Sequence, residues 1–309
     1  MSSAPPPGYY VPAVLYFTAD EELDVPAIQA HVLRLAQGGV TGILVQGSNG
    51  EAQHLSHEER KAAIALTRKT LDESGFNNVL VIAGTGAQST RETKKLCADA
   101  KEAGASHVLV LTPAVWPPQM TVENIIRFHT EVADTCTNYM IYNFPVVTAG
   151  IDLDSDTIGT LAKHPNIVGV KLSCGQIGKL HRLASTYSSS EFAVFAGRSD
   201  FFLTGMLCGS AGVIGATVNV LPKLHGRLLG LHRDGKLSEA MELQAKLGHA
   251  DWALQKLGGI SGVKAIVSKN FGYGVPNVRG PLKALAIESL ADNKHAKALE
   301  ELIALEKSL

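Results

Sequence analysis

A lysine lies within an apolar run of the sequence. Lys171 is the fifth residue of Ile167–Leu172, which reads Ile-Val-Gly-Val-Lys-Leu. Burial disfavours the ammonium form of a lysine, and a neutral amine can attack a ketone to form an imine, or Schiff base. Lys171 is therefore a candidate nucleophile. The alternative is a lysine that ends its strand and extends its amine to solvent, and the sequence alone leaves both open.

Tyr142 comes near the end of another such run, Tyr139–Asn143. If the two runs form neighbouring strands, the phenol of Tyr142 reaches the same site as Lys171. A phenol beside a cationic imine can carry protons to and from the reacting atoms. The alternative is a tyrosine at the rim of the site that makes one hydrogen bond.

A glycine-rich turn, Gly47-Ser48-Asn49-Gly50, follows a third run. Consecutive small residues leave backbone N–H groups free, and such a turn can bind a carboxylate. An ordinary turn is the alternative. We interpret Glu51 as a structural partner of this loop rather than as a general acid.

Eight apolar runs alternate with longer amphipathic stretches. The runs are apolar on both faces, which is typical of parallel strands covered by helices. Eight strand–helix units predict a closed (β/α)8 barrel, the TIM barrel, in which working groups stand at the carboxyl ends of strands. The alternative is an open doubly wound sheet, but no Gly-x-Gly-x-x-Gly follows the first run. The predicted strands are Val11–Phe17, Gly42–Gln46, Val79–Gly84, His107–Thr112, Tyr139–Asn143, Ile167–Leu172, Phe192–Gly197 and Gly212–Thr217.

The predicted helices between and after these strands begin with Val25–Gln37. Ser56-x-x-Glu59 has the pattern of a capping box at the start of the second helix. The remaining predicted helices are Ser56–Ser74, Ser89–Ala103, Val122–Thr135, Asp154–Lys163, Gln176–Tyr187, Asp200–Cys208, Pro222–His232, Leu237–Leu257, Ile260–Lys269 and Asn293–Lys307.

The pattern divides the chain into three parts. Residues 1–8 are expected to form a flexible, proline-rich N-terminal tail, and residues 9–235 the catalytic barrel. Residues 236–309 are expected to form a C-terminal helical extension that packs on the barrel or builds an oligomer contact.

Composition narrows the class of protein. The 309 residues are 45% apolar and 18% charged, with a formal net charge of −1, which fits a globular protein with a large core. No block of like charge indicates a nucleic-acid or membrane surface, so the expected partners are small molecules. The first ten residues carry no charged side chain, and we expect a cytoplasmic location.

Cysteines and histidines give no sign of a metal site. The four cysteines are far apart in the sequence and form no Cys-x-x-Cys, which favours a reduced, intracellular protein. His54 and His57 lack a third ligand in the sequence nearby, so no metal is expected. Cys174 lies close to Lys171, and we interpret it as a small core thiol.

Together these segments resemble the dihydrodipicolinate synthase / N-acetylneuraminate lyase family of class I pyruvate aldolases. The resemblance runs in order from about residue 9 to residue 285 and is more specific than any single motif. The motifs that carry it are Gly47-Ser48-Asn49-Gly50-Glu51, Tyr142-Asn143-Phe144-Pro145 and Val168-Gly169-Val170-Lys171, with weaker matches at Ala196-Gly197, Gly212-Val213-Ile214-Gly215 and Asn219.

The resemblance implies roles for these residues. Lys171 would form the imine with the keto carbon, and Tyr142 would relay protons. Ser48 and Asn49 would bind the carboxylate of pyruvate, while Gly197 and Ile214 would line its pocket. No metal or organic cofactor would be needed, because the lysine imine is the electron sink. A homo-oligomer, tetramer or dimer, is also implied.

The sequence departs from the family at three places. Val146-Val147-Thr148 stands where dihydrodipicolinate synthases have Gly-Arg-Thr, whose arginine pairs with a substrate carboxylate. Ala114-Val115-Trp116 stands where they have a tyrosine pair, so a third relay residue is missing or replaced. Leu172-Ser173 stands where N-acetylneuraminate lyases have an acidic residue directly after the lysine.

Without that arginine, an uncharged polyhydroxy aldehyde is the better second product. In its motifs the chain looks most similar to fungal 2-keto-3-deoxy-L-galactonate aldolases, which form pyruvate and L-glyceraldehyde. Ser173, Thr148 and Gln119 are candidate hydroxyl contacts for such a substrate. The alternatives are a 4-hydroxy-2-oxoglutarate aldolase, a dihydrodipicolinate synthase-like condensation, a 2-keto-3-deoxy acid dehydratase and a non-catalytic binding paralogue.

Overall fold

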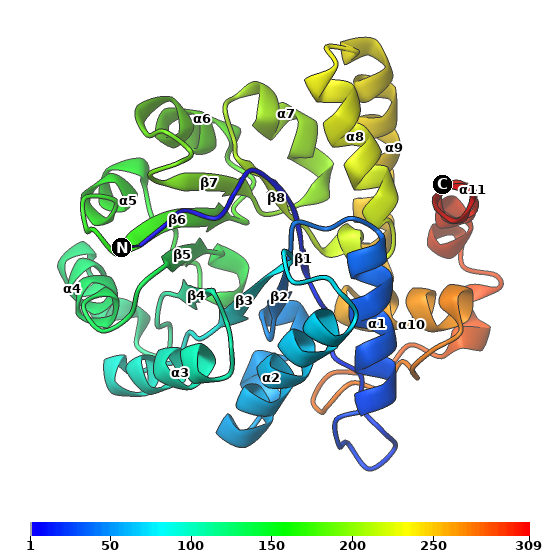
Figure 1. Cartoon of the computed structure of the whole chain (residues 1–309), viewed down its shortest axis with the longest axis horizontal. Coiled ribbons are helices and arrows are strands. Elements are labelled where there is room, and N and C mark those ends of the chain that lie inside the picture. The colour runs from blue at the N-terminus through cyan, green and yellow to red at the C-terminus, as the bar shows by residue number, and fades with distance from the viewer. Residues whose placement is uncertain (1) are drawn as a thin grey trace.

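The computed structural model describes residues 2–309 and has a closed barrel of eight parallel strands at its centre (Figure 1). Each strand pairs with the next along the chain, and β1 closes the barrel by pairing with β8. The predicted (β/α)8 architecture is confirmed. The strands are β1 Gly8–Pro12, β2 Gly42–Val45, β3 Leu80–Gly84, β4 His107–Leu111, β5 Tyr139–Asn143, β6 Ile167–Leu172, β7 Ala193–Ala196 and β8 Gly212–Ile214.

Among residues 2–309, eight α-helices follow the strands and surround the barrel, and three more come after them (Figure 1). The helix α2 begins with the predicted capping box, in which Ser56 and Glu59 each accept a hydrogen bond from the other's backbone N–H. The helices are α1 Val25–Gln37, α2 His57–Glu73, α3 Thr90–Glu102, α4 Val122–Ala133, α5 Ser155–Leu161, α6 Ile177–Thr186, α7 Phe202–Leu207, α8 Pro222–Arg233, α9 Leu237–Lys256, α10 Ile260–Phe271 and α11 Lys294–Ser308.

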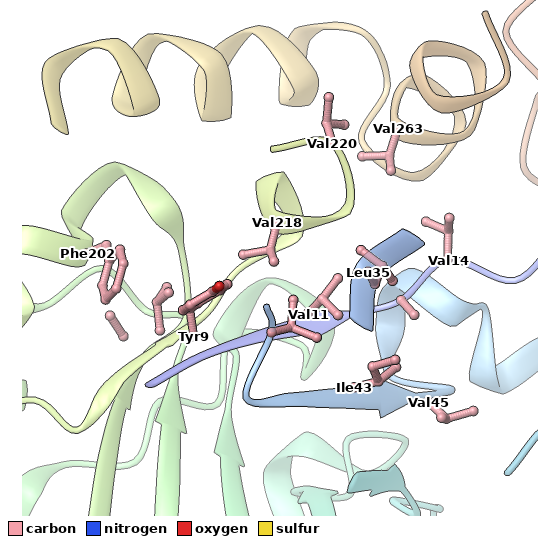
Figure 2. Packing of buried hydrophobic residues seen from close by; sticks show 14 of the residues in the cluster. Tyr9, Val11, Val14, Leu35, Ile43, Val45, Phe202, Val218, Val220 and Val263 are labelled. Carbon is pink, nitrogen blue, oxygen red and sulfur yellow. The ribbon is translucent and has the colours of Figure 1, made fainter. Parts of the chain in front are cut away.

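Side chains of each strand alternate between two apolar cores. In β2, Leu44 points into the barrel, where it joins a cluster that includes Tyr10, Phe195 and Ile214. Ile43 belongs to the larger cluster between the barrel and its helices. Figure 2 shows this outer layer near β1 and β2, where strand residues meet side chains from α1, α7 and the segment after β8.

The first strand differs from its prediction. It was expected at Val11–Phe17, but β1 is Gly8–Pro12, with Tyr10 opposite Gly42. Residues 13–17 are fully buried although they lie outside the barrel sheet. The N–H of Val14 is bonded instead to the Oδ1 of Asn219, at 3.1 Å. The apolar run Val11–Phe17 is apolar because it is buried, and most of it is not a strand.

The proline-rich N-terminal segment contacts one end of the barrel, which the prediction of a flexible tail for residues 1–8 did not anticipate. Ser2 Oγ donates to Asn166, and Ser3 N donates to Asn138, at 2.9 and 2.8 Å. Tyr10 donates from its hydroxyl to the carbonyl of Pro6, at 2.7 Å. These contacts hold residues 2–8 across the amino ends of β5 and β6, and Gly8 already belongs to β1.

The C-terminal helices lie on the side of the barrel where β8 meets β1 (Figure 1). Helix α9 contacts α8 and the short helical turns that follow β7 and β8, and α11 packs against α9. The boundary predicted at residue 235 falls in the turn between α8 and α9. Of the helices described in residues 2–309, none combines the length and apolarity needed to cross a bilayer.

Candidate active site

Lys171 lies on β6, between Tyr142 of β5 and Phe195 of β7. Its side chain is 3% exposed, and its Nζ lies 4.3 Å from the centre of the Tyr142 ring. It lines a cavity of about 400 Å³ at the carboxyl ends of the strands. Within residues 2–309, no carboxylate forms an ion pair with it. The amine therefore faces into the mouth of the barrel, and the alternative of an amine in open solvent is excluded.

The phenol of Tyr142 borders the same cavity. Its ring is 5% exposed and stacks on Phe144, with the ring centres 5.6 Å apart. The hydroxyl of Ser173 lies 3.5 Å from the Tyr142 hydroxyl and 3.4 Å from the carbonyl oxygen of Gly197. The amine of Lys171 and the hydroxyl of Ser173 thus both lie close to Tyr142.

Gly197 brings β7 close to the residue that follows β6. A Cβ at this position would overlap Ser173 Oγ and lie 2.6 Å from the carbonyl oxygen of Leu172. Only glycine fits there without moving backbone, so Gly197 lines the cavity with its main chain.

The turn after β2 presents Ser48 and Asn49 to this cavity. The two residues begin a 3-10 helix, Ser48–Gly50, whose first N–H groups have no partner within the turn. The turn starts from Gln46, which has a left-handed φ of 48°. Free N–H groups at the start of such a turn can bind a carboxylate.

Glu51 fixes the end of that turn. Its carboxylate accepts from Lys264 Nζ at 2.6 Å and from the backbone N–H of Arg279 at 2.9 Å. Lys264 is fully buried and also donates to the carbonyl oxygen of Asn277, at 2.7 Å. Burial lowers the pKa of Lys264 to about 8, while Glu51 opposes the shift. Glu51 is thus the structural partner that the sequence suggested.

Asn143, directly after Tyr142, has a structural role that the sequence did not reveal. Its amide donates to Asp152 at 2.7 Å and accepts from the backbone N–H of Leu153 at 3.1 Å. Asp152 in turn pairs with the buried Lys179 of α6. This network fixes the β5–α5 loop beside the site.

Asn219 links the segments that follow the first and the last strand of the barrel. Its Oδ1 accepts from Val14 and contacts His31 Nε2 at 2.9 Å, while its Nδ2 donates to Pro12 and Ala216. Arg34 donates to its carbonyl oxygen. The weak motif match at Asn219 therefore marks a structural link between the segments after β1 and β8.

Four polar residues that the sequence did not reveal also line the cavity. Arg198, Thr217, Asp251 and Gln255 form a polar group there. They come from the ends of β7 and β8 and from α9, so the C-terminal extension contributes to the site. The same cavity also has an apolar lining, which consists of Val146, Val147, Leu254, Ile260 and Val263.

Three predicted contacts are not among the residues that line this cavity, although Thr148 lines the neighbouring one. Ile214 is fully buried in the barrel interior and is not among the lining residues. The hydroxyl of Thr148 bonds within its own loop, to carbonyl oxygens of Phe144 and Ile151 at 3.1 and 3.0 Å. Gln119 is exposed and lines a separate surface hollow beside α4. The structure therefore brings Ser173, but not Gln119, to Lys171.

A second cavity, of about 310 Å³, adjoins the first and shares Ser48 and Tyr142 with it. The buried Arg60 and Gln46 line it, and Gln46 Oε1 has no hydrogen-bond partner in the described part of the chain.

No group of three or more potential metal-ligating side chains occurs among the described residues 2–309. His54 contacts Glu51 at 3.2 Å, whereas His57 contacts Glu92 at 3.0 Å. The two histidines therefore pair with different carboxylates. Cys174 is partly buried and packs against the core.

Comparison with known proteins places this geometry in context. Residues 6–302 match the model of the "Dihydrodipicolinate synthetase family". The chain is 43% identical to the "Probable 4-hydroxy-2-oxoglutarate aldolase, mitochondrial" of Emericella nidulans, over 98% of this chain and 97% of that protein. It is 38% identical to the "L-threo-3-deoxy-hexylosonate aldolase" of Aspergillus niger, again over 98% and 97%.

A solved structure agrees with these relatives. YagE of Escherichia coli K12, determined in complex with pyruvate, superposes with a TM-score of 0.85 at 30% identity, covering 97% of this chain and 98% of that one. Named aldolases that match over nearly the full length make this protein a carbon–carbon lyase. With barrel, site and sequence in agreement, the chain belongs to the dihydrodipicolinate synthetase family.

Proposed function

We propose that the protein is a Schiff-base, class I aldolase that cleaves a 2-keto-3-deoxy sugar acid. The proposed substrate is 2-keto-3-deoxy-L-galactonate (L-threo-3-deoxy-hexulosonate), and the products are pyruvate and L-glyceraldehyde. The observation that carries the proposal is Lys171, a buried amine without a carboxylate partner among residues 2–309, which faces a cavity beside Tyr142.

The proposed reaction balances without a cofactor. Lys171 Nζ attacks the keto carbon, and loss of water gives a protonated imine. The C4 hydroxyl then loses its proton, the C3–C4 bond breaks, and its electron pair moves into the imine to give an enamine and the free aldehyde. Protonation of C3 and addition of water release pyruvate and restore the amine. Neither a metal nor an organic cofactor has a role in this scheme.

Tyr142 is the proposed proton carrier for these steps, because its phenol borders the amine. Ser173 is the second hydroxyl beside it, 3.5 Å away. Val115 and Trp116, in the segment where dihydrodipicolinate synthases have a tyrosine pair, are 58% and 69% exposed. We therefore assign to Ser173 the proton contact that a third relay residue would make.

The carboxylate of the keto acid would bind at the turn after β2. Ser48 and Asn49 offer free backbone N–H groups, and both line the cavity that contains Lys171. Gly197 leaves space for the planar imine on the opposite side. Ile214 lies deeper in the barrel and would support this pocket from below.

The second product is proposed to be uncharged because the loop after β5 offers no cation. Val146 and Val147 are 83% and 44% exposed there, and neither can bind a carboxylate as an arginine does. The name of the Aspergillus niger relative, an L-threo-3-deoxy-hexylosonate aldolase, supports this substrate class.

A second candidate is cleavage of 4-hydroxy-2-oxoglutarate to pyruvate and glyoxylate. Two observations favour it: the name of the Emericella nidulans relative and the presence of Arg198 in the cavity wall. Rates of cleavage of the two acids by the same preparation distinguish the candidates.

Trapping tests the mechanism directly. Borohydride added in the presence of pyruvate should reduce the imine and leave a stable mass increment on the peptide that contains Lys171. An adduct at another lysine, or none, would contradict the mechanism. Product analysis then separates the aldolase from a dehydratase, which keeps the carbon skeleton intact, and from a binding protein, which releases no pyruvate.

Assembly and location complete the proposal. We propose a homo-oligomer, tetramer or dimer, which sedimentation of the purified chain tests. The cytoplasm remains the predicted compartment, although the name of the Emericella nidulans relative gives that protein as mitochondrial. Imaging of the tagged full-length chain tests the location.

A further inference from the structure

The polar group that lines the cavity centres on Arg198. This residue directly follows Gly197, and with Lys171 it supplies the cationic side chains that line the cavity within the described residues. Its Nη2 lies 2.9 Å from an oxygen of Asp200 and 3.3 Å from an oxygen of Asp251. One guanidinium therefore faces two carboxylates, and the group carries no excess positive charge.

Asp251 is held firmly in place. Its side chain is buried; Oδ1 accepts from Thr217 at 2.8 Å, and Oδ2 accepts from Gln255 at 2.8 Å. The contact with Arg198 also falls on Oδ2. A fixed carboxylate of this kind orients the guanidinium and repels any further carboxylate that approaches it.

Arg198 retains donors for a ligand. Both of its contacts with protein groups in residues 2–309 use Nη2, whereas a guanidinium has five N–H donors in a planar fork. Since Arg198 is partly exposed and lines the cavity, Nε and Nη1 are free to donate to a substrate. Burial and the nearby Asp251 raise the pKa of Asp200, another sign that negative charge is already crowded there.

We propose that Arg198, oriented by Asp251, determines specificity by donating to hydroxyl oxygens of the aldehyde half of the substrate while Asp251 excludes a second carboxylate. The apolar part of the lining, which includes Val147, Leu254 and Ile260, would contact the carbon chain between those hydroxyls. This inference rests on the proposed aldolase function and states which aldehyde half the site accepts.

The test compares two acids in variants of the full chain. Arg198→Met removes the donors and the charge but keeps an unbranched apolar stem. Cleavage of the 2-keto-3-deoxyhexonate should lose about 10- to 100-fold in kcat/KM, as expected for one or two charge-assisted hydrogen bonds. The loss should fall mainly on KM, and borohydride trapping of pyruvate on Lys171 should be unchanged. Arg127→Met, on the outer helix α4, is the matched control. It should change neither kcat/KM for the hexonate nor the trapping of pyruvate on Lys171.

Asp251→Asn gives a second, opposite readout. Removal of the carboxylate should raise the ratio of 4-hydroxy-2-oxoglutarate cleavage to hexonate cleavage by 10-fold or more. The positive charge of Arg198 is then no longer paired with Asp251 and can attract the second carboxylate of the substrate. If this variant does not fold, as judged by circular dichroism, the ratio measured with Arg198→Met decides alone. A larger loss for the dicarboxylate than for the hexonate in Arg198→Met, or no loss for either, would overturn the inference.

Failure of the proposed function looks different. If the wild-type chain gives no adduct with pyruvate and borohydride, the aldolase proposal fails and the assignment of Arg198 fails with it. If the adduct forms while the ratio of the two acids is unaffected in both variants, only the assignment fails.

Discussion

Two buried lysines occupy opposite situations in this barrel. Lys171 is 3% exposed and Lys264 is 0% exposed, and each Nζ lies over an aromatic ring, 4.3 Å from Tyr142 and 4.4 Å from Phe17. Lys264 is bound by Glu51 and by a backbone carbonyl group. Lys171 has no such carboxylate in residues 2–309 and borders a cavity instead.

Burial alone therefore does not identify a reactive amine. A buried ammonium held by a carboxylate and a carbonyl group has its donors occupied, so it serves structure. A buried amine that lacks a counter-charge and adjoins open space can exchange its proton and meet a ligand. Absence of a partner, combined with a cavity, is the informative feature.

The largest effect on activity is expected when Lys171 is replaced. Lys171→Met should lower turnover on the order of 10⁴-fold or more, because no imine can form. Since no ion pair is lost and the volume is nearly kept, the free energy of unfolding should change by about 1 kcal/mol or less. Pyruvate release and urea unfolding measure the two effects. Turnover that persists would show that another group forms the imine.

Loss of the phenol should affect activity next. Tyr142→Phe should reduce turnover roughly 10²- to 10⁴-fold, the usual contribution of a positioned acid–base group, with little change in stability. The matched control is Tyr139→Phe on the same strand, whose hydroxyl bonds to His129 at 2.6 Å in the outer layer. That variant should lose stability and keep its turnover. Equal kinetic losses in both variants would argue against a proton relay through Tyr142.

Removing the structural lysine should act on stability. Lys264→Met leaves Glu51 buried without its cation and should cost about 3–5 kcal/mol of unfolding free energy. Adding Glu51→Gln should restore part of that loss. Urea unfolding of both variants measures the coupling. A loss below about 1 kcal/mol for Lys264→Met would mean that the pair contributes little.

Three buried histidines that stay neutral should give the smallest effect, a dependence of folding stability on pH. Burial lowers the pKa of His31 and His129 to about 3 and that of His225 to about 4, whereas the unfolded value is about 6.5. Between pH 6.5 and pH 4 the unfolded chain thus binds more protons than the folded chain. Stability should fall as pH falls, by up to about 1.4 kcal/mol per pH unit for each histidine.

Unfolding in urea at several pH values checks this. His225→Asn should show a shallower dependence than the wild type, whatever its absolute stability. A dependence as steep as that of the wild type would mean that His225 is already charged in the folded state.

Much of the architecture could be predicted from the sequence because strand and helix periodicities are local. The runs Tyr139–Asn143 and Ile167–Leu172 have the predicted bounds. The first strand was misplaced because residues 13–17 are as apolar as a strand, although they are buried in a connecting segment. Apolar composition reports burial, and only the hydrogen-bond ladder identifies the sheet.

The part of the site that lies at strand ends could be predicted from motifs. The part that other segments contribute could not. The position of Lys171 and Tyr142 at one cavity was predictable because the barrel rule places working groups at the carboxyl ends of strands. Arg198 and Asp251 were missed because 53 positions separate them, and a side chain on α9 gives no local sign that it reaches the mouth. Gln119 was named from its loop, but that loop turns away from the cavity.

The carboxylate of Glu51 has a consequence for how the enzyme is made. It binds Lys264 and Arg279, which lie 213 and 228 positions later in the chain. A ribosome must therefore synthesise nearly the whole polypeptide before the turn that carries Ser48 and Asn49 can acquire its final shape. A nascent barrel whose eight strands have already emerged would still lack the finished turn at Ser48 and Asn49, so catalytic competence should arise only at the end of translation.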